Sequence, residues 1–228
     1  MNYSLKARYF PAVISILPIV VFNYFYLSPY IAGLLNDFNG VSLVVSNVSI
    51  PAIAIYFVVQ LNRFTSKELF EKRIFKDELH MPTTNLMLFS TKFLTDGLKE
   101  ALHRKITHDF GIVLLGKTEE AGNEKLARKK IVEAMGQVRL KVKNGRLVLQ
   151  HNIEYGFVRN LLGGSILGVL SSIWNIIFFD EINHNDFAFK VSAVMLVAFT
   201  LILLFNKIIM ESFGYNYAKV LINEYQQS

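Results

Sequence analysis

Residues 160–179 read NLLGGSILGVLSSIWNIIFF and contain no Asp, Glu, Lys or Arg. A helix rises about 1.5 Å per residue, so this block is long enough to cross a hydrocarbon core of about 30 Å. A soluble domain would instead distribute its apolar residues with the period of its secondary structure. With 228 residues, 52% of them hydrophobic, and a mean hydropathy of +0.34, the chain is predicted to be an integral membrane protein.

Three other segments resemble this block. Residues 9–36 and 41–61 carry no charge, and residues 187–206 carry only Lys190, which lies near one end. Pro18 is expected to kink the first segment because proline removes a backbone donor. The predicted fold class is therefore a membrane α-helical protein with four transmembrane helices and an inserted α+β cytosolic domain.

The distribution of charge predicts the orientation. Residues 62–157 hold 18 Lys and Arg against 12 Asp and Glu, whereas the turns at residues 35–40 and 180–188 hold no Lys or Arg. Because positively charged loops stay in the cytosol, both termini and the middle segment are predicted to be cytosolic. The predicted domains are a first helix pair (residues 1–61), a basic cytosolic domain (62–157), and a second helix pair with a cytosolic tail (158–228).

The clearest local pattern in the middle segment is VRLKVKNGRLVLQH, from Val138 to His151. Asn-Gly between alternating apolar residues is typical of a type I′ β-hairpin. In that register one face would be apolar. The other face would hold four cations, namely Arg139, Lys141, Lys143 and Arg146.

No carboxylate separates these four cations, so they repel one another unless something screens them. One interpretation is a face exposed to solvent and salt, or resting near anionic lipid headgroups. The other is a binding site for a phosphate-rich ligand, a nucleotide or oligonucleotide. Arg128, Lys129 and Lys130 form a second basic cluster that would extend such a site.

Two sets of small or polar residues mark the spans. Gly164, Gly168 and Ser172 recur every four residues and predict close helix packing, either within one chain or between subunits. Ser42, Ser46 and Ser49 share one helical face, which would either line a pore or hydrogen-bond to a neighbouring helix. Four helices are too few to enclose a channel, so a pore would require a homo-oligomer, with a tetramer favoured.

Catalytic signatures are weak. Residues 111–118 read GIVLLGKT and match the P-loop pattern, but Ile-Val-Leu-Leu suits a strand and not a loop that cradles phosphate. The chain has no Cys, and its five His show no metal-ligand spacing. The sequence therefore predicts no enzyme, no metal site and no cofactor.

The order of two spans, a small basic domain and two more spans resembles the membrane effectors of bacterial antiphage systems, namely the Hailong channel subunit and the Kiwa membrane subunit. The resemblance implies an oligomeric channel or pore-forming effector of the inner membrane, regulated by a nucleotide or oligonucleotide at its cytosolic domain. The alternative is a membrane anchor or sensor that docks a cytosolic partner protein and conducts no ions. In both cases the other expected partner is membrane lipid.

Overall fold

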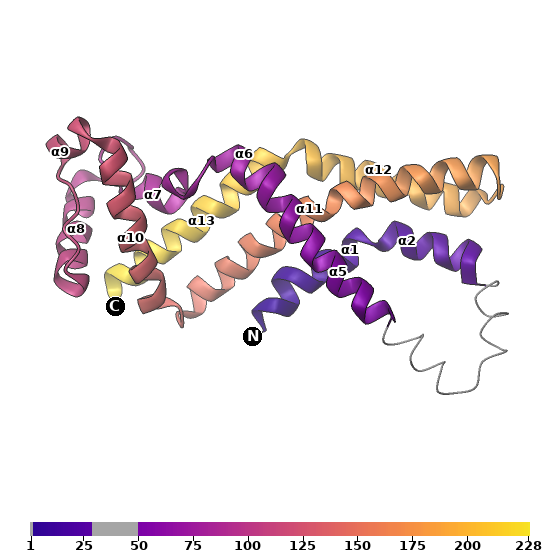
Figure 1. The fold of residues 1–228 in the computed structure, drawn as a ribbon, viewed down its shortest axis with the longest axis horizontal. Helices are drawn as coiled ribbons and strands as arrows, with labels where there is room; N and C mark the ends of the chain where they lie inside the picture. The colour runs from indigo at the N-terminus through magenta and orange to yellow at the C-terminus, as the bar shows by residue number, and fades with distance from the viewer. Residues whose placement is uncertain (1, 29–49) are drawn as a thin grey trace. The chain divides into compact units, whose positions relative to one another are not determined.

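The computed structural model describes residues 2–28 and 50–228, and all regular structure in these residues is helical (Figure 1). The elements are η1 (Leu5–Tyr9), α1 (Phe10–Ser15), α2 (Leu17–Phe22), η2 (Asn23–Leu27), α5 (Ile50–Thr65), η4 (Ser66–Glu71), α6 (Lys72–Phe75), η5 (Glu78–His80), α7 (Pro82–Met87), α8 (Asp96–Phe110), α9 (Lys117–Gly122), α10 (Glu124–Val142), α11 (Arg146–Glu181), α12 (Asp186–Leu204) and α13 (Asn206–Gln227). They form two compact units. The first comprises Met1–Phe70 and Gly156–Lys207, and the second comprises Glu71–Tyr155 and Ile208–Ser228.

Helices α11 and α12 are long and apolar enough to cross a membrane, and they coincide with the third and fourth predicted spans over most of those spans' length. The segments Leu5–Ser15 and Leu17–Leu27 pass the same test only together, as one span bent by 46°. The bend lies at Ile16, next to Pro18, as the sequence predicts, because proline cannot donate to the helix ladder. The prediction of four spans is wrong for the described residues, which contain two such helices, or three with the bent pair.

In the first unit, glycines let neighbouring helices approach α11 closely. A Cβ added at Gly164 would lie 2.5 Å from Asn62 Nδ2 and 2.7 Å from Ser15 Cβ. A Cβ at Gly168 would lie 2.6 Å from the Phe199 ring on α12. Small residues take this role in membrane helices because lipid offers no hydrophobic drive for helix association, so contact depends on close packing.

Three carboxamides add hydrogen bonds between the helices of this unit. Asn62 donates to Ser15 Oγ at 3.1 Å, and Asn160 and Asn175 on α11 donate to the carbonyls of Ala7 (2.6 Å) and Pro18 (2.7 Å). All three asparagines are almost fully buried. Such bonds hold the broken N-terminal helix to α11, since an unpaired amide in an apolar environment would be costly.

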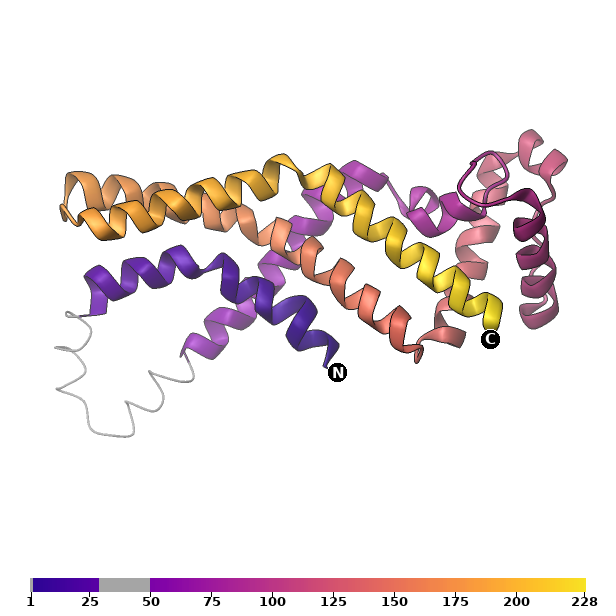
Figure 2. The same cartoon turned by 180° about the vertical axis from the view of Figure 1, so that it is seen from behind.

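The second unit is a helical domain with its own core. Residues of α7, α8, α10 and the start of α11 bury a continuous set of apolar side chains. Ala218, Leu221, Ile222 and Tyr225 of α13 belong to the same core. The sequence predicts a cytosolic tail after the last span. Residues 208–228 instead form part of this domain. In Figure 2, α13 is the yellow helix that ends at the C-terminus.

The predicted β-hairpin and α+β domain are wrong. Residues 138–151 are the end of α10, a short turn and the start of α11. A type I′ turn needs positive φ at Asn144 and Gly145, and neither has it. Val138 and Val142 are buried while Leu140 is 61% exposed, so the apolar residues follow the helical period and not the alternation of a strand.

The hairpin and the helix give opposite expectations for Leu140. In the helix, Val138→Ala is expected to lower the free energy of unfolding by about 1–3 kcal/mol, because it deletes buried methyl groups. Leu140→Ala is expected to change it by less than about 0.5 kcal/mol, as at other exposed positions. Thermal unfolding of the purified variants measures both, and equal losses would contradict the helical assignment.

The contact between Gly168 and Phe199 predicts a specific defect. Gly168→Ala forces a methyl group into the Phe199 ring and is expected to cost about 1–3 kcal/mol of stability in detergent. Adding Phe199→Leu to the same chain is expected to restore part of that loss, because it opens space on α12. A double variant less stable than Gly168→Ala alone would show that the two residues do not pack together.

Candidate functional site

The corner between α10 and α11 holds a cavity whose charged lining residues are both basic. Gly145 N–H donates to the Val142 carbonyl at 3.0 Å, and Leu149 N–H donates to the Gly145 carbonyl at 2.9 Å, so the chain passes from one helix to the next in a tight turn. A cavity of about 560 Å³ lies beside this turn. Its lining residues are Gly136, Gln137, Arg139, Leu140, Lys143, Val148, Leu149, Asn152 and Tyr217.

Arg139 and Lys143 provide the charge of this cavity, and none of its lining residues is acidic. They are four residues apart on α10 and therefore lie on the same helical face. Arg139 Nη2 donates to Thr83 Oγ1 at 3.0 Å, and its remaining N–H groups are available to a ligand. Lys143 is exposed and forms no ion pair with any residue in the described part of the chain.

The other two cations of the predicted basic face lie elsewhere. Lys141 points to α8, where its Nζ donates to Asp109 Oδ2 at 2.7 Å. Tyr225 donates to the same oxygen at 3.0 Å. These hydrogen bonds, that of Lys141 first, hold the pKa of Asp109 well below its usual range. Arg146 is exposed at the start of α11 and does not line the cavity.

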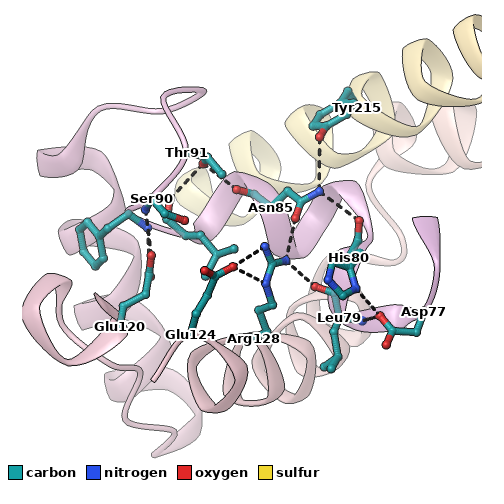
Figure 3. A network of polar contacts seen from close by, with 12 residues as sticks. Asp77, Leu79, His80, Asn85, Ser90, Thr91, Glu120, Glu124, Arg128 and Tyr215 are labelled. Atoms are coloured by element: carbon teal, nitrogen blue, oxygen red, sulfur yellow. Dashed lines mark hydrogen bonds and ion pairs between the residues drawn. The ribbon is translucent and has the colours of Figure 1, made fainter. Parts of the chain in front are cut away.

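The second basic cluster, Arg128–Lys130, does not join the cavity. Arg128 forms a 2.7 Å ion pair with Glu124 and donates to the Leu79 carbonyl (2.7 Å) and to Asn85 Oδ1 (2.8 Å). Figure 3 shows these contacts converging on Arg128, with Asn85 also donating to Tyr215. Arg128 therefore joins α10 to the η5–α7 segment and has a structural role. Lys130 donates to the Val113 carbonyl at 3.0 Å, and Lys129 is exposed.

A buried acid organises the loop that follows α7. The Glu120 side chain is 3% exposed and accepts the backbone N–H groups of Phe89 (3.0 Å) and Ser90 (2.8 Å). Figure 3 shows Glu120 beside Ser90. Lys99 is fully buried and donates to the Thr91 carbonyl of the same loop. Burial lowers the pKa of the Lys99 ammonium, and the charges of Asp96 and Glu120 oppose that shift.

The P-loop match does not correspond to a phosphate site. Residues 111–116 form a loop with no regular structure, in which Gly111 has φ +68° and ends α8. Helix α9 is only six residues long, and the Glu119 side chain already accepts the N–H of Gly116 at 3.0 Å. Lys117 forms a 2.7 Å ion pair with Asp96. These contacts leave no cradle for a phosphate group.

A second cavity, of about 410 Å³, lies between α8 and the loops before and after it. Its lining residues include His103, Arg104, Lys117 and Glu100, so cations and an anion are mixed. Burial lowers the pKa of the His103 imidazole, which keeps the ring neutral. Among the described residues, no group of three or more His, Asp or Glu side chains is placed to hold a metal ion.

The residues predicted within the spans fall into two sets. Gly164 and Gly168 contact other helices of the same chain, and Ser172 is buried on α11 with no hydrogen-bond partner for its hydroxyl among the described residues. The predicted pore-lining stripe, Ser42, Ser46 and Ser49, lies outside the described residues.

The sequence analysis missed four polar or open positions of the cavity, namely Gly136, Gln137, Asn152 and Tyr217. Gln137 and Asn152 are common surface residues, and Tyr217 is distant in sequence, so none has a signal of its own. Gly136 does have one. It lies inside a continuous 19-residue helix, where alanine would be more favourable by about 1 kcal/mol. A glycine at such a position usually has a packing or functional reason.

Comparison of the chain with protein-family models, with characterised proteins and with solved structures found no match.

The buried position of Glu120 predicts a structural effect that does not depend on any ligand. Glu120→Gln removes one of two oxygen acceptors that hold the loop at Phe89 and Ser90, and it removes one of the two negative charges, those of Asp96 and Glu120, that act on Lys99. The variant is expected to lose about 1–3 kcal/mol of stability and to show faster amide exchange in residues 88–95. Glu133→Gln, at an exposed position of α10, serves as the control. Unchanged exchange at Phe89 and Ser90 would contradict this role of Glu120.

Proposed function

We propose that this protein is a ligand-responsive membrane protein of the bacterial inner membrane. Its second unit, in the cytosol, binds a phosphate-rich ligand at the cavity beside the α10–α11 turn. Its apolar helices assemble with those of other copies into a channel whose conductance depends on that ligand. Both termini are cytosolic in this proposal, because the basic residues lie in the segments that would then face the cytosol.

The observation that carries the proposal is the continuity of α11. Val148, Leu149 and Asn152 of this helix line the cavity, and residues 160–179 of the same unbroken helix form its uncharged apolar segment. A continuous helix transmits a rotation or shift along its length, because every turn is fixed to the next by hydrogen bonds. A ligand that contacts Asn152 therefore acts on the element that crosses the bilayer.

The order of the segments supports the same proposal. An apolar segment, a basic helical domain and further apolar helices follow one another, as in the antiphage effectors that the chain resembles. We place the protein in that context on the order of the segments, and we assign no residue from it.

The experiment is ion flux through liposomes that contain the full-length protein, measured with and without mononucleotides, cyclic nucleotides and short oligonucleotides. One of these ligands is expected to change the flux. The double variant Arg139→Glu/Lys143→Glu is expected to lose that response because it reverses the charge of the cavity. Lys125→Glu, on an exposed face of α10 outside the cavity, is expected to retain it. A normal response in the double variant would refute the proposal.

A second function, docking of a cytosolic protein without conductance, is favoured by one observation. Leu140 is 61% exposed and Leu147 is 55% exposed, and both lie near the exposed cations Lys143 and Arg146 at the α10–α11 turn. Exposed apolar residues rimmed by charge are typical of protein interaction sites. Two results together would support docking over the channel. The protein, shown to be inserted and oligomeric, would conduct no ions in any condition, and Leu140→Glu would weaken its binding to a partner.

A further inference from the structure

The cavity beside the α10–α11 turn differs in charge from the two other cavities described in the second unit. The cavity at His103 includes Glu100, and a small cavity of about 60 Å³ beside Arg139 includes Glu78. The 560 Å³ cavity combines two cations with no carboxylate. Two cations that share one face repel each other, and a bound anion would remove that repulsion.

The other lining groups specify more than an anion. Gln137 and Asn152 contribute side-chain amide groups to the lining. Leu140, Val148 and Leu149 provide an apolar wall. A small number of polar groups around an apolar surface, in a volume between about 300 and 1,000 Å³, is typical of sites for compact organic ligands.

Gly136 keeps one wall of this cavity open. It lies inside α10, and no atom comes within 4 Å of a Cβ built on it. Packing therefore does not require glycine here, and the residue costs the helix about 1 kcal/mol relative to alanine. A glycine at a cavity wall allows a ligand to approach the backbone closely.

The available charge limits the size of the ligand. Of the seven cations that the sequence assigns to a ligand site, only Arg139 and Lys143 line the cavity. Lys141 and Arg128 are ion-paired within the protein, and Lys130 donates to a backbone carbonyl. Two cations balance one or two phosphate groups, whereas an oligonucleotide adds a phosphate with each residue.

The length of α11 argues against a lipid headgroup as the source of that phosphate. Arg146 begins the helix and Asn160 begins its uncharged segment, a distance of about 20 Å along the axis. The polar layer of a bilayer extends only about 5–8 Å beyond the hydrocarbon core. The turn at residues 143–145 therefore lies beyond the headgroups when α11 crosses the membrane.

We infer that this cavity binds a compact soluble phosphate ester with an apolar ring, of the size of a mononucleotide, with its phosphate on Arg139 and Lys143 and its ring against Leu140, Val148 and Leu149. The regulatory meaning of this site rests on the proposed function, but the binding itself does not.

The test is equilibrium binding of a fluorescently labelled adenine mononucleotide to the full-length protein in nanodiscs of zwitterionic lipid. Wild-type protein is expected to bind the probe, and unlabelled mononucleotide is expected to compete far better per phosphate than inorganic phosphate. Gly136→Leu fills the cavity from its wall and is expected to weaken binding about tenfold or more. It is expected to leave the melting temperature unchanged or higher, because leucine favours the helix. Gly97→Leu on α8 is the matched control, since a Cβ at Gly97 also meets no atom within 4 Å.

Other outcomes would refute the site, the type of ligand or the proposed function. Absence of probe binding by the wild type, or unchanged binding by a folded Gly136→Leu variant, refutes the site. Binding that is abolished in nanodiscs of anionic lipid assigns the cavity to headgroups, and tighter binding of oligonucleotides per phosphate assigns it to a polymer. Probe binding without any change in ion flux leaves the site intact and refutes only the proposed function. A ligand-dependent flux that is unchanged in Gly136→Leu supports the proposed function and refutes this site.

Discussion

The first unit depends on the close approach of neighbouring helices to α11, which occurs at Gly163, Gly164 and Gly168. At Gly163 the backbone carbonyl of Asn62 occupies the space where a side chain would be, and at Gly168 the ring of Phe199 does so. Lipid provides no hydrophobic drive for this association, so van der Waals contact and hydrogen bonds have to provide it. The asparagines follow from the same constraint. Once the backbones are this close, the Nδ2 groups of Asn62, Asn160 and Asn175 reach acceptors on the N-terminal helix, whereas the buried Oδ1 atoms of Asn62 and Asn160 have no partner among the described residues.

The second unit solves a different problem, because its short helices and loops leave many backbone groups outside the helix ladders. Buried and half-buried charges satisfy them. Glu120 accepts two N–H groups of the loop after α7, Lys99 donates to a carbonyl of the same loop, and Arg128 donates to the carbonyl of Leu79. At the far end of α8, Asp109 receives Lys141 and Tyr225. Some cations of this domain, among them Lys99, Arg128 and Lys141, are thus engaged within it. Arg139 and Lys143 line the α10–α11 cavity and give it its charge.

One helix belongs to both units. Residues 146–155 of α11 form part of the helical domain, and residues 156–181 form part of the membrane unit. Gly145, immediately before α11, packs against the Glu224 side chain of α13, so the start of the helix contacts the C-terminal helix of its own domain. Both parts belong to one continuous helix, Arg146–Glu181.

The sequence alone located helices apolar and long enough to cross a membrane, namely the apolar part of α11 and α12, and the bend near Pro18, because uncharged length and proline act locally and need no partner. It predicted the helix-packing role of Gly164 and Gly168 but left open which helix would meet them. It misassigned residues 138–151, because Val138 and Val142 fit both a two-residue and a four-residue period, Leu140 fits only the two-residue period, and Asn-Gly suits a turn between strands or between helices. Only tertiary structure decided between these, by burying Val138 and Val142 together against α13 and leaving Leu140 outside. Tertiary structure also decided which cations line the cavity and which form ion pairs within the protein. Whether a lysine meets Asp109 or an open cavity depends on contacts between residues more than thirty positions apart, and no local pattern encodes them.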